Sequence, residues 1–118
     1  MKNILLINGS AGANSANQKL IDLFIQQTST DFQCTLLPDL KTLPHFDPWL
    51  SENSPPQEII ELRKLVETSD GIIICTPEYV FSIPSGLKNM LEWCVATTVF
   101  SEKAVGLITA SAHGAKRA

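Results

Sequence analysis

Three short, uninterrupted apolar runs constrain the fold of this chain more than any other feature. Residues 4–7, 71–75 and 104–110 carry no alternating polar face. Strands of this kind are buried on both faces, which is typical of parallel sheets with helices on either side. Residues 32–37, which mix apolar residues with a β-branched threonine, are predicted to add the second strand in chain order. The pattern therefore predicts four strands of a parallel sheet.

Helical periodicity separates these strands. Apolar residues recur at helical spacing after Ser15, which can cap the helix, after the Pro55-Pro56 pair, and from about Ser85 to Ala96. Residues 41–57, by contrast, are predicted to form a long loop. Alternating strands and helices imply right-handed crossovers, with ligand-binding loops beyond the carboxyl ends of the strands. We expect these loops after Ile7, Cys75 and Ala110.

Length and composition set the class of protein. A chain of 118 residues with 44% hydrophobic and 18% charged residues is expected to form one packed domain over residues 1–118. The net charge of -3 and the lack of a basic cluster argue against a nucleic-acid groove. The first apolar run is too short for a signal peptide, and no run reaches the roughly 20 residues of a membrane span. A cytoplasmic protein is expected.

Cysteine and histidine residues give no pattern of metal ligands. Cys34, Cys75 and Cys94 are odd in number and far apart, and are expected to be buried free thiols in a reducing compartment. His45 and His113 are distant in sequence and lack metal-ligand spacing. No metal site is predicted.

The loop NGSAGANSAN, residues 8–17, lies between the first strand and the first helix and is a candidate anion site. Backbone N–H groups and a helix N-terminus would point there at one place beyond the sheet. Gly9 permits close approach of the backbone, and Ser10, Ser15 and Asn17 can donate hydrogen bonds to phosphate oxygens. A plain turn followed by a capped helix is the alternative.

Other phosphate-binding classes match this loop less well. The GK[ST] sequence of a nucleoside-triphosphate loop does not occur. Gly9 and Gly12 match G-x-G-x-x-G poorly, and Asp39 at the end of the second strand is the feature that keeps dinucleotide binding open.

The segment PEYVFSIPSGLKNMLEW, residues 77–93, follows the third strand and opens into a helix. If the third strand neighbours the first, Pro77, Glu78 and Tyr79 lie beside the first loop and line the same cleft. Exposed peptides with Tyr79 and Phe81 can border a flat ring system. A proline-bracketed turn whose aromatic side chains pack on the sheet is the alternative.

These motifs together resemble those of the NADPH-dependent FMN reductase family. The resemblance covers essentially the whole chain and is carried by Gly9-Ser10, Ser15 with Asn17, Leu43-Pro44, Pro77-Glu78-Tyr79, Leu87-Lys88-Asn89 and Trp93. It implies a flavodoxin-like three-layer α/β/α sandwich with strand order 2-1-3-4, the fifth strand of the fold being absent from this chain.

The resemblance also implies the activity: NAD(P)H reduces bound FMN by hydride transfer, and the electrons pass to a quinone, a free flavin or another acceptor. It implies Ser10, Ser15 and Asn17 as phosphate ligands, with Gly9 in the same loop. Pro77, Glu78 and Tyr79 would lie beside the isoalloxazine ring, with Glu78 assigned to loop geometry and no catalytic acid or base demanded. Ser111 and Gly114 resemble the start of a third flavin loop, and a homodimer or homotetramer is expected.

Three departures from the family pattern matter for function. Gly12 stands where the family often has an arginine, Val80 where an asparagine often follows P-E-Y, and the last strand with its flanking helices is missing. Loss of the arginine removes a charge-assisted hydrogen bond and predicts weaker FMN binding. The alternative function is therefore a non-catalytic flavodoxin-like fragment, or an interaction module, that binds FMN weakly or not at all.

Overall fold

The computed structural model describes residues 2–9, 16–37, 39–77, 84–95, 97, 99 and 103–110. Strands and helices alternate along the chain as the apolar runs predict. In order, the elements are β1 (Lys2–Asn8), α1 (Ala16–Thr28), β2 (Phe32–Leu36), the 3-10 helix η1 (Leu40–Thr42), α2 (Pro48–Asn53), α3 (Gln57–Thr68), β3 (Gly71–Pro77), α4 (Ser85–Val95) and β4 (Ala104–Ala110).

The four strands form one parallel sheet in the order β2-β1-β3-β4. The predicted strand order is confirmed, and β1 and β3 are central. Asn8 at the end of β1 is opposite Cys75 of β3, so the loops that follow these two strands begin side by side. This is the point at which the strand order reverses, where α/β sheets bind ligands.

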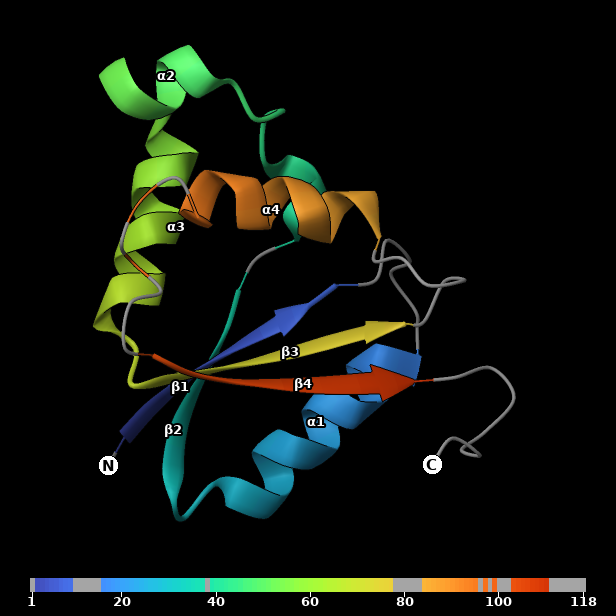
Figure 1. The fold of residues 1–118 in the computed structure, drawn as a ribbon. Helices are drawn as coiled ribbons and strands as arrows, with labels where there is room; N and C mark the ends of the chain where they lie inside the picture. Colours follow the sequence, from blue (N-terminus) through green and yellow to red (C-terminus); the bar gives the residue numbers. More distant parts are fainter. Residues whose placement is uncertain are drawn as a thin grey trace.

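Helices cover both faces of the sheet, as Figure 1 shows: α1 lies on one face, and α3 and α4 lie on the other. The larger apolar core lies on the α3 and α4 side and includes Leu5, Ile72 and Trp93. The smaller core lies under α1 and contains Leu6 and Ile21. Successive residues of β1 enter opposite cores, which explains why its run has no polar face.

The segment predicted to be one long loop contains short helices, and that part of the prediction is wrong. Asp47 caps the N-terminus of α2 by accepting a hydrogen bond from the Leu50 N–H at 3.1 Å, and Pro48 follows it. A capping aspartate before a proline is a local helix-start signal. The prolines and serines on either side of it concealed that signal.

The outer strand β4 is an edge strand of the sheet, as the predicted order 2-1-3-4 requires. Its apolar sequence indicates an interior strand, but Val105 and Leu107 are 52% and 65% exposed. Both project from the same face because they are two residues apart. Among the described residues only β3 pairs with β4, so one edge and part of one face of this strand remain uncovered.

Candidate functional site at the carboxyl ends of β1 and β3

Gly9 begins the first candidate loop and is packed so closely that a side chain there would require its neighbours to shift. Its N–H donates to the Cys75 carbonyl oxygen at 2.7 Å, which continues the β1–β3 pairing into the loop. A Cβ at this position would lie 2.9 Å from Leu87 Cδ2 and 3.2 Å from Thr76 Oγ1. Gly9 therefore brings three elements, β1, β3 and α4, into contact at the predicted ligand end of the sheet.

Asn17 lies in the first turn of α1 and is almost completely buried, with 2% of its surface exposed. Its Nδ2 donates to the Cys75 carbonyl oxygen at 2.9 Å and to Asn8 Oδ1 at 3.5 Å. A primary amide has two N–H donors, and both are engaged inside the protein. The Asn17 side chain thus fastens the start of α1 to the ends of β1 and β3.

Two further amides join this connection, and the sequence motifs do not single them out. Asn8 Nδ2 donates to Gln18 Oε1 at 3.2 Å, and Gln18 Nε2 donates to Asp22 Oδ1 at 3.0 Å. They link the last residue of β1 to the first two turns of α1. The signal available in the sequence was the pairing of an amide at the strand end with two amides at the helix start.

Asn89 of the L-K-N motif and Trp93 connect α4 to the segment before α2. Asn89 Nδ2 and Trp93 Nε1 both donate to the Pro44 carbonyl oxygen at 2.9 Å, and Asn89 Oδ1 accepts from the Phe46 N–H at 2.8 Å. The Phe46 ring packs edge-on against the buried Trp93 ring, with the two ring centroids 5.1 Å apart. Asn89 and Trp93 therefore hold the backbone of residues 44–46 against α4. In the sequence, α4 directly follows the second candidate loop.

Arg63 of α3 secures the other end of α4. Its Nη2 donates to the Trp93 carbonyl oxygen at 2.8 Å and to Ser51 Oγ at 2.7 Å. A cation beside a carbonyl at a helix C-terminus is favourable both as a hydrogen bond and toward the helix dipole. The helices α2, α3 and α4 are thus joined through one guanidinium group.

The remaining predicted site residues lie outside the part of the chain that the structure describes. They are Ser10, Ser15, Glu78, Tyr79, Ser111 and Gly114. Pro77 is the last residue of β3, opposite Ala110 of β4. The structure thus brings Gly9, Asn17 and the end of β3 together, and the roles of the others stay predictions.

Two of the three cysteine thiols are buried. Cys75 and Cys94 are 1% and 0% exposed, whereas Cys34 is half-buried, and all three are free. Burial raises the pKa of Cys75, and it raises the pKa of Cys94 to about 11, with the Arg63 charge acting in the opposite direction. Both thiols are therefore protonated at neutral pH. Their low exposure confirms the burial expected for these two cysteines.

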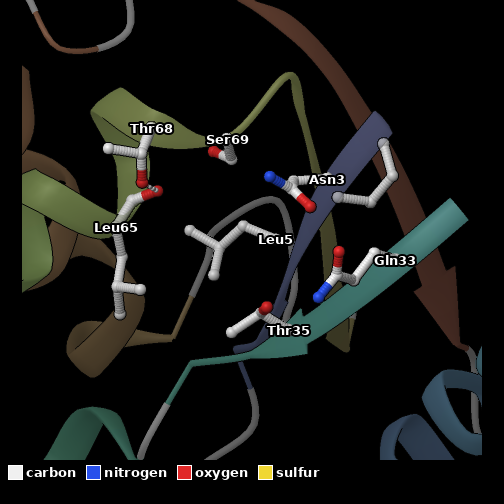
Figure 2. A pocket seen from close by; sticks show the side chains of 8 residues that line it. Asn3, Leu5, Gln33, Thr35, Leu65, Thr68 and Ser69 are labelled. Atoms are coloured by element: carbon white, nitrogen blue, oxygen red, sulfur yellow. Dashed lines mark hydrogen bonds between the residues drawn. The ribbon is translucent and has the colours of Figure 1, made fainter. Parts of the chain in front are cut away.

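A different hollow of about 190 Å³ lies at the amino ends of β1 and β2. Figure 2 shows Asn3, Gln33 and Thr35 on its strand side, with Leu65 and Thr68 of α3 across from them. No predicted site residue lines this hollow. It lies at the opposite end of the strands from Gly9 and Asn17.

Among the described residues, no three His, Cys, Asp or Glu side chains gather as metal ligands. In the same part of the chain, no helix combines the length and apolar character needed to cross a membrane.

Comparison with known proteins agrees with this geometry. The chain is 34% identical to the NADH:(hydroxy)cinnamate reductase subunit CrdA of Vibrio ruber over 96% of its length and 55% of that protein. It is 28% identical to a quinone reductase of Escherichia coli over 76% of its length and 48% of that protein. The chain therefore spans about half the length of the curated relatives it matches.

Solved structures give the same result. The flavoenzyme NAD(P)H:(acceptor) oxidoreductase FerB of Paracoccus denitrificans superimposes with a TM-score of 0.83 at 26% identity, over 92% of this chain and 60% of that one. The flavodoxin-like fold expected from the sequence is thus confirmed. The family model for NADPH-dependent FMN reductases matches residues 2–118, and the chain belongs to this family.

Proposed function

We propose that this chain binds FMN at the carboxyl ends of β1 and β3 and acts in NAD(P)H-dependent flavin reduction. The observation that carries the proposal is the pair of hydrogen bonds that the Cys75 carbonyl oxygen accepts. That oxygen accepts from the Gly9 N–H at 2.7 Å and from Asn17 Nδ2 at 2.9 Å. Both ends of the first loop are thereby held beside the strand that leads into the P-E-Y loop.

The residues at this edge fit a phosphate group. The first turn of α1 carries backbone N–H groups that have no partner within the helix, and Asn17 fixes that turn at the strand ends. Because both Asn17 side-chain donors are engaged, we assign Asn17 to phosphate binding through its backbone N–H. The hydroxyl groups of Ser10 and Ser15 would supply further donors. With Gly12 in place of an arginine, these ligands are neutral and FMN binding is correspondingly weak.

The ring would lie along the second loop. Pro77, Glu78 and Tyr79 are the proposed neighbours of the isoalloxazine, and Ser111 and Gly114 the start of a third loop that completes the site. The chemistry that FMN supplies is two-electron transfer, with NAD(P)H as hydride donor and a quinone or free flavin as acceptor. The protein's own part is to hold the two ring systems in contact, so Glu78 serves loop geometry.

The names of the relatives support these acceptors. They include quinone reductases and the NADH-dependent flavin reductase subunit 2 of Lactobacillus johnsonii. We further propose that residues 1–118 form one FMN-binding domain of a cytoplasmic homo-oligomer, a dimer or tetramer. The free thiols of Cys34, Cys75 and Cys94 support a reducing compartment.

A second candidate function rests on β4. Val105 and Leu107 expose apolar surface beside an edge that no described strand pairs with. A chain with this surface uncovered would retain the packing of the fold but hold FMN weakly, and would act as an interaction module.

Flavin titration separates the two functions. FMN added to the purified 118-residue chain should show saturable quenching of flavin fluorescence, and NADPH or NADH should then bleach the bound flavin without oxygen. Riboflavin, which lacks the phosphate and therefore every phosphate hydrogen bond proposed above, should bind at least about tenfold more weakly. A folded sample without saturable FMN binding would contradict the reductase proposal for this chain and favour the interaction module.

A further inference from the structure

Asn89 of α4 makes two hydrogen bonds of opposite polarity to one short stretch of backbone. Its Nδ2 donates to the Pro44 carbonyl oxygen at 2.9 Å, and its Oδ1 accepts from the Phe46 N–H at 2.8 Å. The side-chain amide thus pairs with this backbone through one donor and one acceptor, as another peptide group would. Hydrogen bonds of this kind weaken outside roughly 2.7–3.2 Å, so the two bonds fix the position of α4 along this backbone to within about 0.5 Å.

The segment that Asn89 contacts, residues 39–46, is itself attached to the sheet. It follows Leu37, whose N–H donates to the Leu6 carbonyl oxygen of β1 at 2.9 Å. Within the segment, Leu40 is buried in the larger apolar core. Residues 39–46 therefore give α4 a fixed reference that is connected to β1, the strand leading into the first candidate loop.

The other contacts of α4 determine the position of its first turns less closely. Its inner side is buried in the larger core, and apolar contacts have no preferred direction, so helices packed in this way can slide by small amounts. Arg63 and Trp93 make their hydrogen bonds toward the C-terminal end of the helix. Of the side-chain hydrogen bonds between α4 and other described elements, those of Asn89 lie nearest its start.

The start of α4 lies against the first candidate loop and follows the second. Leu87 Cδ2 is the atom that a Cβ on Gly9 would meet at 2.9 Å, so the first turn of α4 packs on the end of β1. Residues 77–79, the proposed neighbours of the flavin ring, precede this turn in the sequence. Because binding sites respond to displacements of about 0.5–1 Å in their supporting groups, a shift of α4 would be felt at the ring.

We propose that Asn89 is a positioning residue for the flavin ring and acts through α4. The proposal rests on the FMN site proposed above and gives the asparagine of the L-K-N motif a role in flavin binding and reduction. Without its amide, the start of α4 shifts and the loop after β3 holds the ring less closely. The midpoint potential of the bound flavin then changes as well, because the groups around the ring tune its electronics.

Asn89→Leu, which keeps the volume of the side chain and removes both hydrogen bonds, tests this role by flavin titration and redox titration. The variant should bind FMN and riboflavin about tenfold more weakly, by the same factor for both, because the change acts at the ring that the two ligands share. The midpoint potential of bound FMN should shift. Asn89→Asp retains an acceptor for the Phe46 N–H and should show the same changes if the leucine variant does not fold.

Ser69→Ala is the matched control at the amino ends of the strands. It removes one buried hydrogen bond, from Ser69 Oγ to the Val66 carbonyl oxygen at 2.8 Å, and should leave flavin affinity and potential unchanged. Circular dichroism checks that each variant folds. Equal flavin changes in Ser69→Ala would show that Asn89 acts only through general stability, and would overturn its positioning role.

The remaining outcomes separate this role from the proposed function. A folded wild-type chain that binds no FMN overturns the FMN site and the role of Asn89 together. A wild-type chain that binds FMN, with an Asn89→Leu variant of unchanged affinity and potential, overturns the positioning role alone. Weaker binding of FMN with unchanged binding of riboflavin would place the effect at the phosphate, and would also contradict positioning of the ring.

Discussion

The two ends of the parallel sheet are made by the same strands, yet they use polar side chains in different ways. At the carboxyl ends, Asn17 is buried and donates to the Cys75 carbonyl oxygen at 2.9 Å. At the amino ends, Asn3, Gln33 and Thr35 surround an open hollow of about 190 Å³, and their side chains form no hydrogen bonds within the described residues (Figure 2).

The amino end is a polar surface, whereas the carboxyl end has buried polar groups that hold the backbone in place. A buried, engaged amide fixes the position of the backbone around it, because leaving its partners unpaired is unfavourable. An exposed amide forms hydrogen bonds with water in both the folded and the unfolded chain. It therefore does little to fix the position of the backbone. The carboxyl end should therefore respond to small changes in shape, and the amino end should tolerate them.

The largest effect is expected at Gly9. Gly9→Ala places a methyl group 2.9 Å from Leu87 Cδ2 and 3.2 Å from Thr76 Cβ. Overpacking of this kind should lower the free energy of unfolding by about 1–3 kcal/mol and weaken FMN binding. Urea denaturation and flavin titration measure the two effects.

The matched control for Gly9 is Gly71, the first residue of β3 at the amino end. A Cβ there meets Ile4 Cδ1 at 3.2 Å, the end of a flexible side chain. Gly71→Ala should change stability by less than about 1 kcal/mol, because Ile4 Cδ1 can shift, whereas the Thr76 Cβ that Gly9→Ala meets is attached directly to the backbone of β3. Equal losses at Gly9 and Gly71 would contradict the distinction between the two ends.

Asn17 should give the next largest effect. Asn17→Leu keeps the volume of the side chain but removes the donors to the Cys75 carbonyl and to Asn8 Oδ1. The Cys75 carbonyl oxygen would keep the Gly9 N–H but lose its second donor, so stability should fall by about 0.5–1.5 kcal/mol, and FMN should dissociate faster. Stopped-flow flavin release measures the second effect. An Asn17→Leu chain that retains wild-type flavin kinetics would show that the start of α1 needs no such tether.

Cys94 gives a pH dependence of stability. Its pKa rises from 9.0 to about 11 in the folded chain, so above pH 9 the unfolded chain loses a proton that the folded chain keeps. Stability should therefore be unaffected by this thiol below pH 9 and should fall as the pH rises toward 11. Cys94→Ala should remove this part of the slope in denaturation curves recorded across that range. An unchanged slope would mean that the thiolate is tolerated in the core.

The smallest effect is expected at the amino-end hollow. Gln33→Leu and Thr35→Val alter exposed side chains of β2. Each should change the free energy of unfolding by no more than about 0.5 kcal/mol and leave FMN affinity unchanged. Loss of FMN binding in either variant would indicate that FMN binds at the amino ends of the strands, contrary to the proposed site.

Periodicity predicted the sheet and its crossovers because each strand enters a core on both faces. It failed at α2, where the Asp47 cap stands among loop-forming residues. At β4 the apolar pattern indicated an interior strand, while the predicted order 2-1-3-4 placed the strand at the edge, where Val105 and Leu107 are exposed. Sequence spacing also placed Asn17 near the start of the first helix, where the structure has it. Where its two N–H groups point depends on the Cys75 carbonyl, 58 residues away along the chain, which no local pattern encodes.

The most direct test of the central claim is a residue-resolved FMN titration followed by amide NMR of the 118-residue chain. Our account predicts saturable shifts at Gly9, Asn17 and Thr76, with Asn3, Gln33 and Thr35 unchanged. Shifts confined to those three amino-end residues, or no saturable shift in a folded sample, would contradict it.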